Sequence, residues 1–160
     1  MDAMTHSATA ASADPTVTER QLWMAVLARA DADDIARRLE ACGPVPDWQV
    51  LRGPESGLVM VRGRAGGGGA AFNLGEMTVT RCTVRTTGGR IGHAYVAGRD
   101  AKARLAALVD ALLQAPDLTT RIHQGVISPL LQAQQHSRAA IARKAAATKV
   151  QFFTLANMRT

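Results

Sequence analysis

The chain of 160 residues has 47% apolar and 20% charged residues, values close to the average of globular domains. This length favours a single compact domain, and the composition excludes collagen-like, wholly disordered and disulfide-scaffold proteins. No apolar run approaches the roughly 18 residues of a membrane span and the start has no signal-peptide pattern, so a cytoplasmic protein without a membrane segment is expected.

The net charge of +6 comes from the C-terminal end of the chain. Up to Asp117 the 13 acidic residues are balanced by 13 basic ones, whereas residues 118–160 contain six basic residues and no acidic residue. Such a segment favours an anionic partner, namely nucleic acid, a phosphorylated small molecule or an acidic protein surface, although a solvated face is equally compatible with it. No nucleic-acid partner is expected, because few aromatic residues lie among the basic ones to stack on bases.

The first part of the chain predicts a tail followed by two helices. Residues 1–17 are rich in Ala, Ser and Thr and show no period, which predicts a disordered N-terminal tail ahead of one domain over residues 18–160. Thr18 and Gln21 have the spacing of a capping box, and apolar residues then recur at helical spacing. Asp31 is expected to cap the second helix of this N-terminal pair.

Between residues 47 and 99 the apolar pattern becomes alternating, which predicts β-strands. Four strands are expected, over residues 48–51, 58–62, 76–86 and 91–97, with a hairpin turn at 53–57. Strands in this order favour an antiparallel meander sheet. Alternation places Arg81 and Arg85 on one face of it, and the register decides whether other arginines share that face.

The remainder of the chain predicts helices that cover the sheet. Asp100 is expected to cap a helix with an apolar stripe, and Ser128 followed by Pro129 is typical of a helix start. The long helix predicted over residues 129–149 has few large apolar side chains, so we expect it to lie at a subunit interface. The predicted fold class is therefore α+β: a four-stranded antiparallel meander sheet covered by helices, with an N-terminal helical pair and a long C-terminal helix.

The sequence contains no complete catalytic set and no metal-binding pattern. Its four histidines have no metal-ligand spacing, and no serine or cysteine lies in a nucleophile motif. Cys42 and Cys82 are interpreted as buried small apolar residues. The glycine run at 66–69 lacks the Lys-Ser/Thr ending of a P-loop, so a flexible loop is favoured over a phosphate cradle. No catalytic residue, metal or cofactor is expected in this chain.

An anion site is the sharper hypothesis, because a guanidinium group makes two parallel hydrogen bonds to a phosphate or phosphonate. The candidate residues are Arg64, Arg81, Arg85, His93 and Arg99. The alternatives are solvated or interface arginines and a histidine that is packed or on the surface.

Five stretches of the sequence carry a resemblance to a known family. They are RQLWMAVLA at 20–28, GLVMVRGR at 57–64, GEMTVTRCTVR at 75–85, GHAYVAGRD at 92–100 and VQFFT at 150–154. In order and spacing, over residues 19–155, they resemble the PhnG subunits of the bacterial carbon–phosphorus lyase system, which degrades alkylphosphonates.

The resemblance implies membership of a soluble complex with PhnH-, PhnI- and PhnJ-like subunits and a PhnL-like ATPase. There the PhnI-like subunit is expected to transfer an alkylphosphonate to the ribose C1 of ATP, with magnesium, releasing adenine and giving a ribose 1-phosphonate 5-triphosphate. An iron–sulfur cluster and S-adenosylmethionine are expected in a partner subunit, where the carbon–phosphorus bond is cleaved. The chain itself is expected to be a noncatalytic subunit.

Two hypotheses follow. In the first, the chain docks on a PhnI-like partner through the helix of Trp23 and the C-terminal helix, with Ile141, Phe152 and Phe153 as further interface candidates. In the second, the chain is a stand-alone phosphate- or phosphonate-binding protein that uses the sheet arginines.

Overall fold

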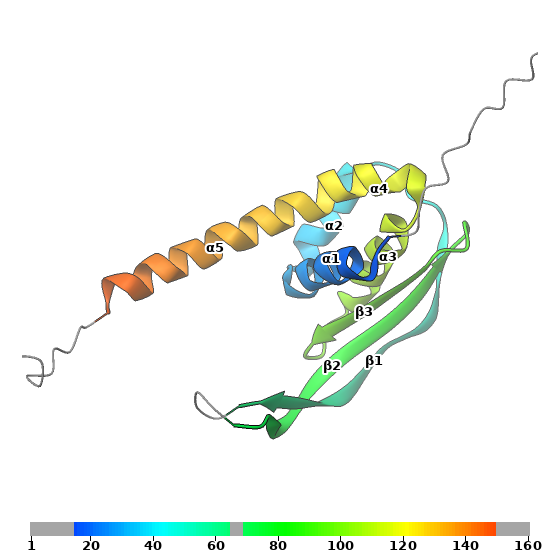
Figure 1. Cartoon of the computed structure of the whole chain (residues 1–160). Helices are drawn as coiled ribbons and strands as arrows, with labels where there is room; N and C mark the ends of the chain where they lie inside the picture. Colours follow the sequence, from blue (N-terminus) through cyan, green and yellow to red (C-terminus); the bar gives the residue numbers. More distant parts are fainter. Residues whose placement is uncertain (1–14, 65–68, 150–160) are drawn as a thin grey trace, which may run out of the picture.

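The computed structural model describes residues 15–64 and 69–149, in which helices lie on one side of a curved antiparallel sheet (Figure 1). In chain order the elements are α1 (Val17–Arg29), α2 (Ala32–Ala41), β1 (Trp48–Gly63), β2 (Phe72–Thr86), β3 (Ile91–Ala97), α3 (Ala103–Leu113), α4 (Pro116–Ile122), the π-helix η1 (His123–Ile127) and α5 (Ser128–Ala147). The α+β class and the long C-terminal helix are confirmed.

The two N-terminal helices form as predicted, with one correction at the first cap. The capping box consists of Thr16 and Glu19: the Glu19 amide donates to the Thr16 hydroxyl at 3.2 Å, and the Thr16 amide donates to the Glu19 carboxylate at 2.9 Å. The predicted pair, Thr18 and Gln21, was wrong. Both pairs of residues have the three-residue spacing of the motif, and the pair that forms the box lies two residues earlier in the chain. Asp31 caps α2 by accepting from the Asp33 amide at 2.9 Å.

The sheet has three strands in the order β1-β2-β3 within the described residues, not the four expected. The predicted hairpin turn at 53–57 is absent because the strand continues through it: Glu55 pairs with Arg81 and Ser56 with Thr80. Register shifts between Val50 and Glu55 absorb the extra residues, so turn-forming sequence produces β-bulges inside β1. The connection between β2 and β3 is the tight turn expected there, with Gly89 at φ +80°.

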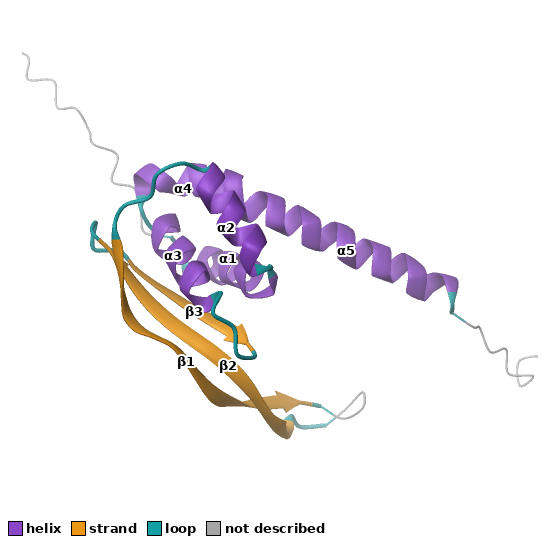
Figure 2. Cartoon of the chain, turned by 180° about the vertical axis from the view of Figure 1, so that it is seen from behind, coloured by secondary structure: helices purple, strands orange, loops and turns teal. Residues whose placement is uncertain are grey.

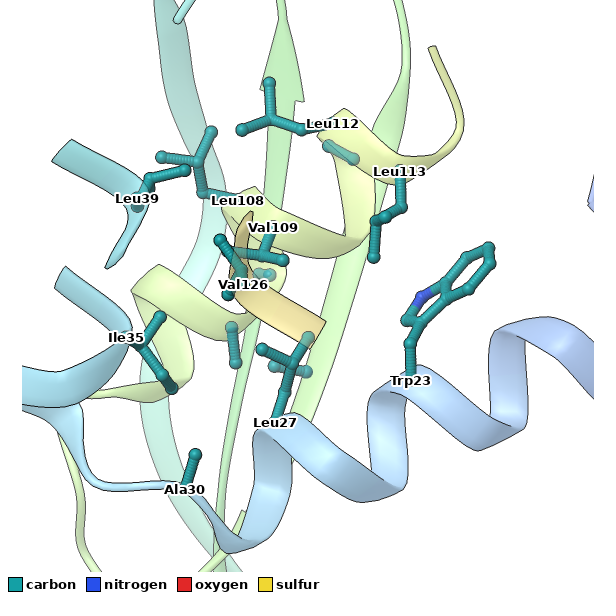
Figure 3. Close-up of a cluster of buried hydrophobic side chains, with 14 of the residues drawn as sticks. Trp23, Leu27, Ala30, Ile35, Leu39, Leu108, Val109, Leu112, Leu113 and Val126 are labelled. Carbon is teal, nitrogen blue, oxygen red and sulfur yellow. The ribbon is translucent and has the colours of Figure 1, made fainter. Parts of the chain in front are cut away.

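The core lies between the sheet and the helices. α3 lies against the sheet, and α1 and α2 pack around it, as the two opposite views show (Figures 1 and 2). Figure 3 shows side chains from these helices converging, and fully buried members include Leu27, Ile35, Val109 and Leu112. The backbones of β3 and α3 approach each other most closely at Gly92. A Cβ on this residue would lie 1.9 Å from the Ala107 carbonyl oxygen of α3, so only glycine fits there.

One uninterrupted helical segment runs from α4 through η1 into α5. α5 begins at Ser128 as predicted, but Ser128 does not cap it, because the preceding residues are already helical and no side chain caps α5. The 20 residues of α5 span about 30 Å at 1.5 Å per residue, and most of that length extends beyond the other helices (Figure 1). None of the helices in the described ranges has the length and apolar character of a membrane span.

The predicted tail falls mostly outside the described residues. Residues 1–14 are not described, whereas Val17, which the prediction placed in the tail, is the first residue of α1.

Candidate functional site

The face of the sheet away from the helices carries three of the predicted anion-binding residues. The register pairs Arg81 with Tyr95, Thr83 with His93 and Arg85 with Ile91. The alternate residues of β3, Gly92, Ala94 and Val96, face the core and are buried. Arg81 and Arg85 therefore share one face, as their alternation predicted, and the register adds His93 to it. We call this surface the open sheet face.

A charged cluster occupies one part of the open sheet face. The Glu55 carboxylate accepts from Arg52 Nε at 2.6 Å and from Arg81 Nε at 2.6 Å. The hydrogen bond from Arg52 is the main reason that the pKa of Glu55 lies below its ordinary value, with a smaller contribution from Arg81. Arg81 is thus held in an ion pair, and the negative charge of Glu55 offsets part of the attraction that Arg81 would exert on a bound anion.

His93 is held in place from both sides of its strand. Its ring Nδ1 lies 3.1 Å from the Thr83 hydroxyl on the open sheet face, and its backbone amide donates to the Asp110 carboxylate at 2.8 Å. Arg85 is exposed on the neighbouring strand. His93 and Arg85 are consequently the predicted anion contacts that remain most accessible together.

The structure does not bring all five candidates to one place. Arg64 follows β1 at the far end of the hairpin, and Arg99 follows β3. Since Gly63 pairs with Phe72 and Ala97 with Val79, the two strand ends are seven β2 residues apart, about 23 Å at 3.3 Å per residue. Most of the glycine run, residues 66–68, lies outside the described residues.

The strongest polar cluster is one that the sequence analysis missed. Asp110 on α3 is completely buried and accepts from Arg20 at 3.0 and 2.7 Å, from Trp23 Nε1 at 2.9 Å and from the His93 amide. A single carboxylate thereby joins α1, α3 and β3. The available signal was a single acidic residue within the otherwise apolar stretch 105–113, since a buried charge requires partners.

Trp23, predicted to contact a partner, belongs mainly to the core of this chain. Only 5% of the residue is exposed, and its indole nitrogen donates to Asp110. On the same helix Leu22 is 65% exposed. Leu22 is therefore the more accessible apolar side chain on α1, and the interface role of Trp23 stays a prediction.

A groove of about 500 Å³ lies where α1, α4, η1 and the start of α5 meet. Trp23, Val26, Ile127 and Leu131 contribute apolar surface to it, and His123 contributes an imidazole. This volume and mixed lining are typical of surfaces that accept a small molecule or an inserted side chain.

The predicted interface helix is exposed along most of its length. Ile141 on α5 is 64% exposed, whereas Leu130 is buried at the end of the helix nearest the core. Gln134 Nε2 donates to the Val26 carbonyl oxygen at 2.9 Å, which fixes the first turns of α5 on α1. Phe152 and Phe153 lie outside the described residues, so their interface role stays a prediction.

The two cysteines differ in burial. Cys82 is buried, and burial raises the pKa of its thiol. Cys42 is only partly buried, which corrects the prediction for that residue. Across the described ranges no group of three or more His, Cys, Asp or Glu side chains is arranged around a metal position.

Comparison with known proteins accounts for the shared sequence stretches. The family model described as "Phosphonate metabolism protein PhnG" matches residues 18–158. The chain is also similar to the alpha-D-ribose 1-methylphosphonate 5-triphosphate synthase subunit PhnG of Rhizobium meliloti (strain 1021), with 43% identity over 148 residues, which is 90% of this chain and 92% of the relative. The chain therefore belongs to the PhnG family of phosphonate metabolism proteins.

Proposed function

We propose that the chain is the PhnG subunit of an alpha-D-ribose 1-methylphosphonate 5-triphosphate synthase and acts in phosphonate catabolism. The observation that carries this proposal is its 43% identity, over 90% of its length, to a relative named as that subunit. Similarity that extends over nearly the whole of both chains favours a shared role in assembly as well as a shared fold.

In this proposal the chain supports a reaction that a partner performs. The PhnI-like subunit transfers an alkylphosphonate to the ribose C1 of ATP, with magnesium, and adenine leaves. PhnH- and PhnJ-like subunits and a PhnL-like ATPase complete the system, and the iron–sulfur cluster and S-adenosylmethionine belong to the PhnJ-like subunit. The surfaces that support a noncatalytic, assembling role are the exposed length of α5 and the open sheet face.

The chemistry of α5 favours an acidic surface on the partner. Arg138, Arg143 and Lys144 are exposed on this helix, which carries no acidic residue. Alanines lie between them and allow a close approach of the two backbones. Ile141 adds one exposed apolar side chain to the same part of the helix.

Co-expression with the PhnH-, PhnI- and PhnJ-like subunits tests the assignment. The full chain should be recovered in a stable complex. A variant lacking residues 138–160 retains Leu130, Leu131 and Gln134, which attach α5 to the core, and should fold but lose the complex. The triple variant Arg138→Glu, Arg143→Glu and Lys144→Glu should weaken assembly, whereas Arg37→Glu, a single charge reversal at an exposed side chain of α2, is the control for charge reversal away from α5.

The result that contradicts the proposal is equally concrete. If the variant without residues 138–160 is recovered in the complex as efficiently as the full chain, α5 does not form the interface. If the full chain recovers none of the three subunits, the assignment as a complex subunit fails.

A second candidate function is direct binding of a phosphate or phosphonate by the open sheet face. It is favoured by one observation, the shared orientation of Arg81, Arg85 and His93. Titration of the isolated chain with ATP and with methylphosphonate should then give saturable binding that Arg85→Ala abolishes, while Arg99→Ala, which alters an arginine beyond the end of β3, leaves it unchanged.

A further inference from the structure

The three strands of the sheet differ in length, which leaves part of β2 with one neighbour. β1 has 16 residues and β2 has 15, whereas β3 has seven and pairs only with Val79–Arg85. At Gly98, whose φ is +81°, the chain leaves the sheet. Beside residues 72–78 of β2 the described chain places no third strand, so this hairpin end extends as a two-stranded ribbon (Figure 2).

The free edge of β2 presents backbone hydrogen-bonding groups. The Thr78 carbonyl oxygen accepts from the Gly98 amide at 2.8 Å, so the Thr78 peptide groups point toward the β3 side. Residues two apart in a strand point their amide and carbonyl groups the same way. The Glu76 amide and carbonyl therefore also point to the β3 side, where β3 has already ended.

Both faces of this ribbon carry exposed apolar side chains. Val59 pairs with Met77 on one face, and they are 39% and 42% exposed. Leu58 and Met60, on the other face, are 64% and 51% exposed. Isolated two-stranded ribbons are only marginally stable in water, so a ribbon with apolar residues on both faces is typical of a segment that a neighbour completes.

The sheet edges differ in how they are interrupted, and β2 itself has one register shift, at Asn73 and Leu74 opposite Arg62. The first half of β1 has Pro54 and two register shifts, which interrupt a pairing edge. On β3 the Ile91 carbonyl accepts from Gln114, and the His93 amide donates to Asp110. Between the register shift of β2 and the start of the pairing with β3, residues 75–78 of β2 pair regularly with β1 and have no third strand of the described chain beside them, so this short edge is open to pairing.

We propose that an extended segment of a partner subunit adds as a third strand along residues 75–78 of β2, in line with β3. This inference rests on the proposed function, since the partner is another subunit of the synthase. The main chain of the added segment would bond to Glu76. Gly75 has no side chain and nothing lies within 4 Å of its Cβ position, so the face of β2 is unobstructed there for a side chain of the added strand.

A second copy of this chain fits the same edge less well. Two copies paired around a two-fold axis at Glu76 would bring the Glu76 carboxylates opposite each other, and like charges in opposed positions destabilise a sheet. Shifting the axis toward Thr78 moves the pairing toward Gly98, where β3 and its turn occupy the position of the added strand. Shifting it the other way moves the pairing onto the register shift at Asn73 and Leu74, where the edge is irregular.

Replacing Glu76 separates main-chain pairing from any side-chain effect. Glu76→Pro removes the amide that points to the open edge and leaves the neighbouring bonds to β1 in place, whereas the control Glu76→Ala keeps the amide. In co-expression with the PhnH-, PhnI- and PhnJ-like subunits, we expect Glu76→Pro to weaken complex formation at least about tenfold relative to Glu76→Ala. Circular dichroism of each variant checks that the fold is intact.

Amide hydrogen exchange supplies a second, independent measurement on the unmodified chain. The Glu76 amide should exchange rapidly in the isolated chain and become protected in the complex, whereas the His93 amide, which is bonded to Asp110, should be protected in both.

Three outcomes overturn the inference, and they are distinguishable. If the complex forms but Glu76→Pro assembles as well as Glu76→Ala and the amide stays unprotected, only the strand pairing is refuted. If the isolated chain is a dimer with this amide already protected, the occupant is a second copy. If the unmodified chain binds no subunit, the proposed function and this inference both fail.

Discussion

The indole nitrogen of Trp23 donates a 2.9 Å hydrogen bond to the carboxylate of Asp110, which lies 87 residues further along the chain. The same carboxylate forms a two-point ion pair with Arg20, from the same helix as Trp23. It also accepts from the His93 amide, so the position of β3 depends on a group inside the helical layer. Asp110, which holds β3 from the core side of the sheet, is thus completely buried.

Replacing Asp110 should strongly destabilise the fold. In Asp110→Ala the Arg20 guanidinium, the Trp23 indole and the His93 amide all lose their acceptor, and we expect the free energy of unfolding to fall by about 3–5 kcal/mol. Trp23→Phe removes one donor and keeps an aromatic ring, although a smaller one, so its loss should be about 1–3 kcal/mol. Urea denaturation followed by circular dichroism measures both; a loss below that of Trp23→Phe for Asp110→Ala would contradict the role of Asp110 as the common acceptor.

Gly92 should not tolerate a methyl group. Its added Cβ would meet the Ala107 carbonyl oxygen at 1.9 Å and the Ala111 amide nitrogen at 2.6 Å, so β3 and α3 must separate to admit it. We expect Gly92→Ala to lower the free energy of unfolding by about 1–3 kcal/mol, the usual cost of overpacking, or by more where backbone must move. Gly88→Ala, in the nearby turn with more space around its Cβ position, is the control for the general effect of replacing glycine.

The pKa of Glu55 should report the arginine cluster on the open sheet face. Since Arg52 first and Arg81 second hold that pKa below its ordinary value of 4.5, their interaction with Glu55 stabilises the folded chain above that pH. The stabilisation is lost as the pH falls through the folded-state pKa. An NMR titration should find the Glu55 pKa raised toward its ordinary value in Arg52→Ala and unchanged in Arg85→Ala; equal values in the two variants would refute the assignment.

The two cysteines should differ in their reaction with thiol reagents. Burial raises the pKa of the Cys82 thiol, which lowers the fraction of reactive thiolate at neutral pH, while Cys42 is partly exposed. Ellman's reagent should therefore modify one thiol of the native chain quickly and the second only on unfolding. Cys42→Ala should remove the fast phase; a fast phase that persists in this variant would place the reactive thiol at Cys82.

Sequence predicted best those features that depend on local periodicity. The helical spacing around Trp23 predicted α1, and alternation placed Arg81 and Arg85 on one face. The prediction failed where the same residue types occur in two kinds of local structure. Gly53 and Pro54 are typical of a turn, but here they lie in bulges of a longer strand whose pairing with β2 continues on both sides. That outcome depends on contacts with distant residues, which local spacing does not encode.

The candidate site was predictable to a lesser extent for the same reason. The separation of Arg64 from Arg99 follows from a strand register, and the burial of Asp110 follows from donors on α1 and β3. Neither can be read from neighbouring residues. The family, by contrast, was accessible from sequence because its shared stretches recur in order along most of the chain.

The π-helix between α4 and α5 determines the side of the molecule to which Ile141 points. A π turn contains about one residue more than an α turn, and one residue corresponds to about 100° of rotation around a helix axis. Shortening His123–Ile127 by one residue would rotate α5 by about 100° around its own axis relative to α4. The basic and apolar side chains of α5 would then face a different side of the molecule. The orientation of the exposed helix is thus encoded in five residues close to the core.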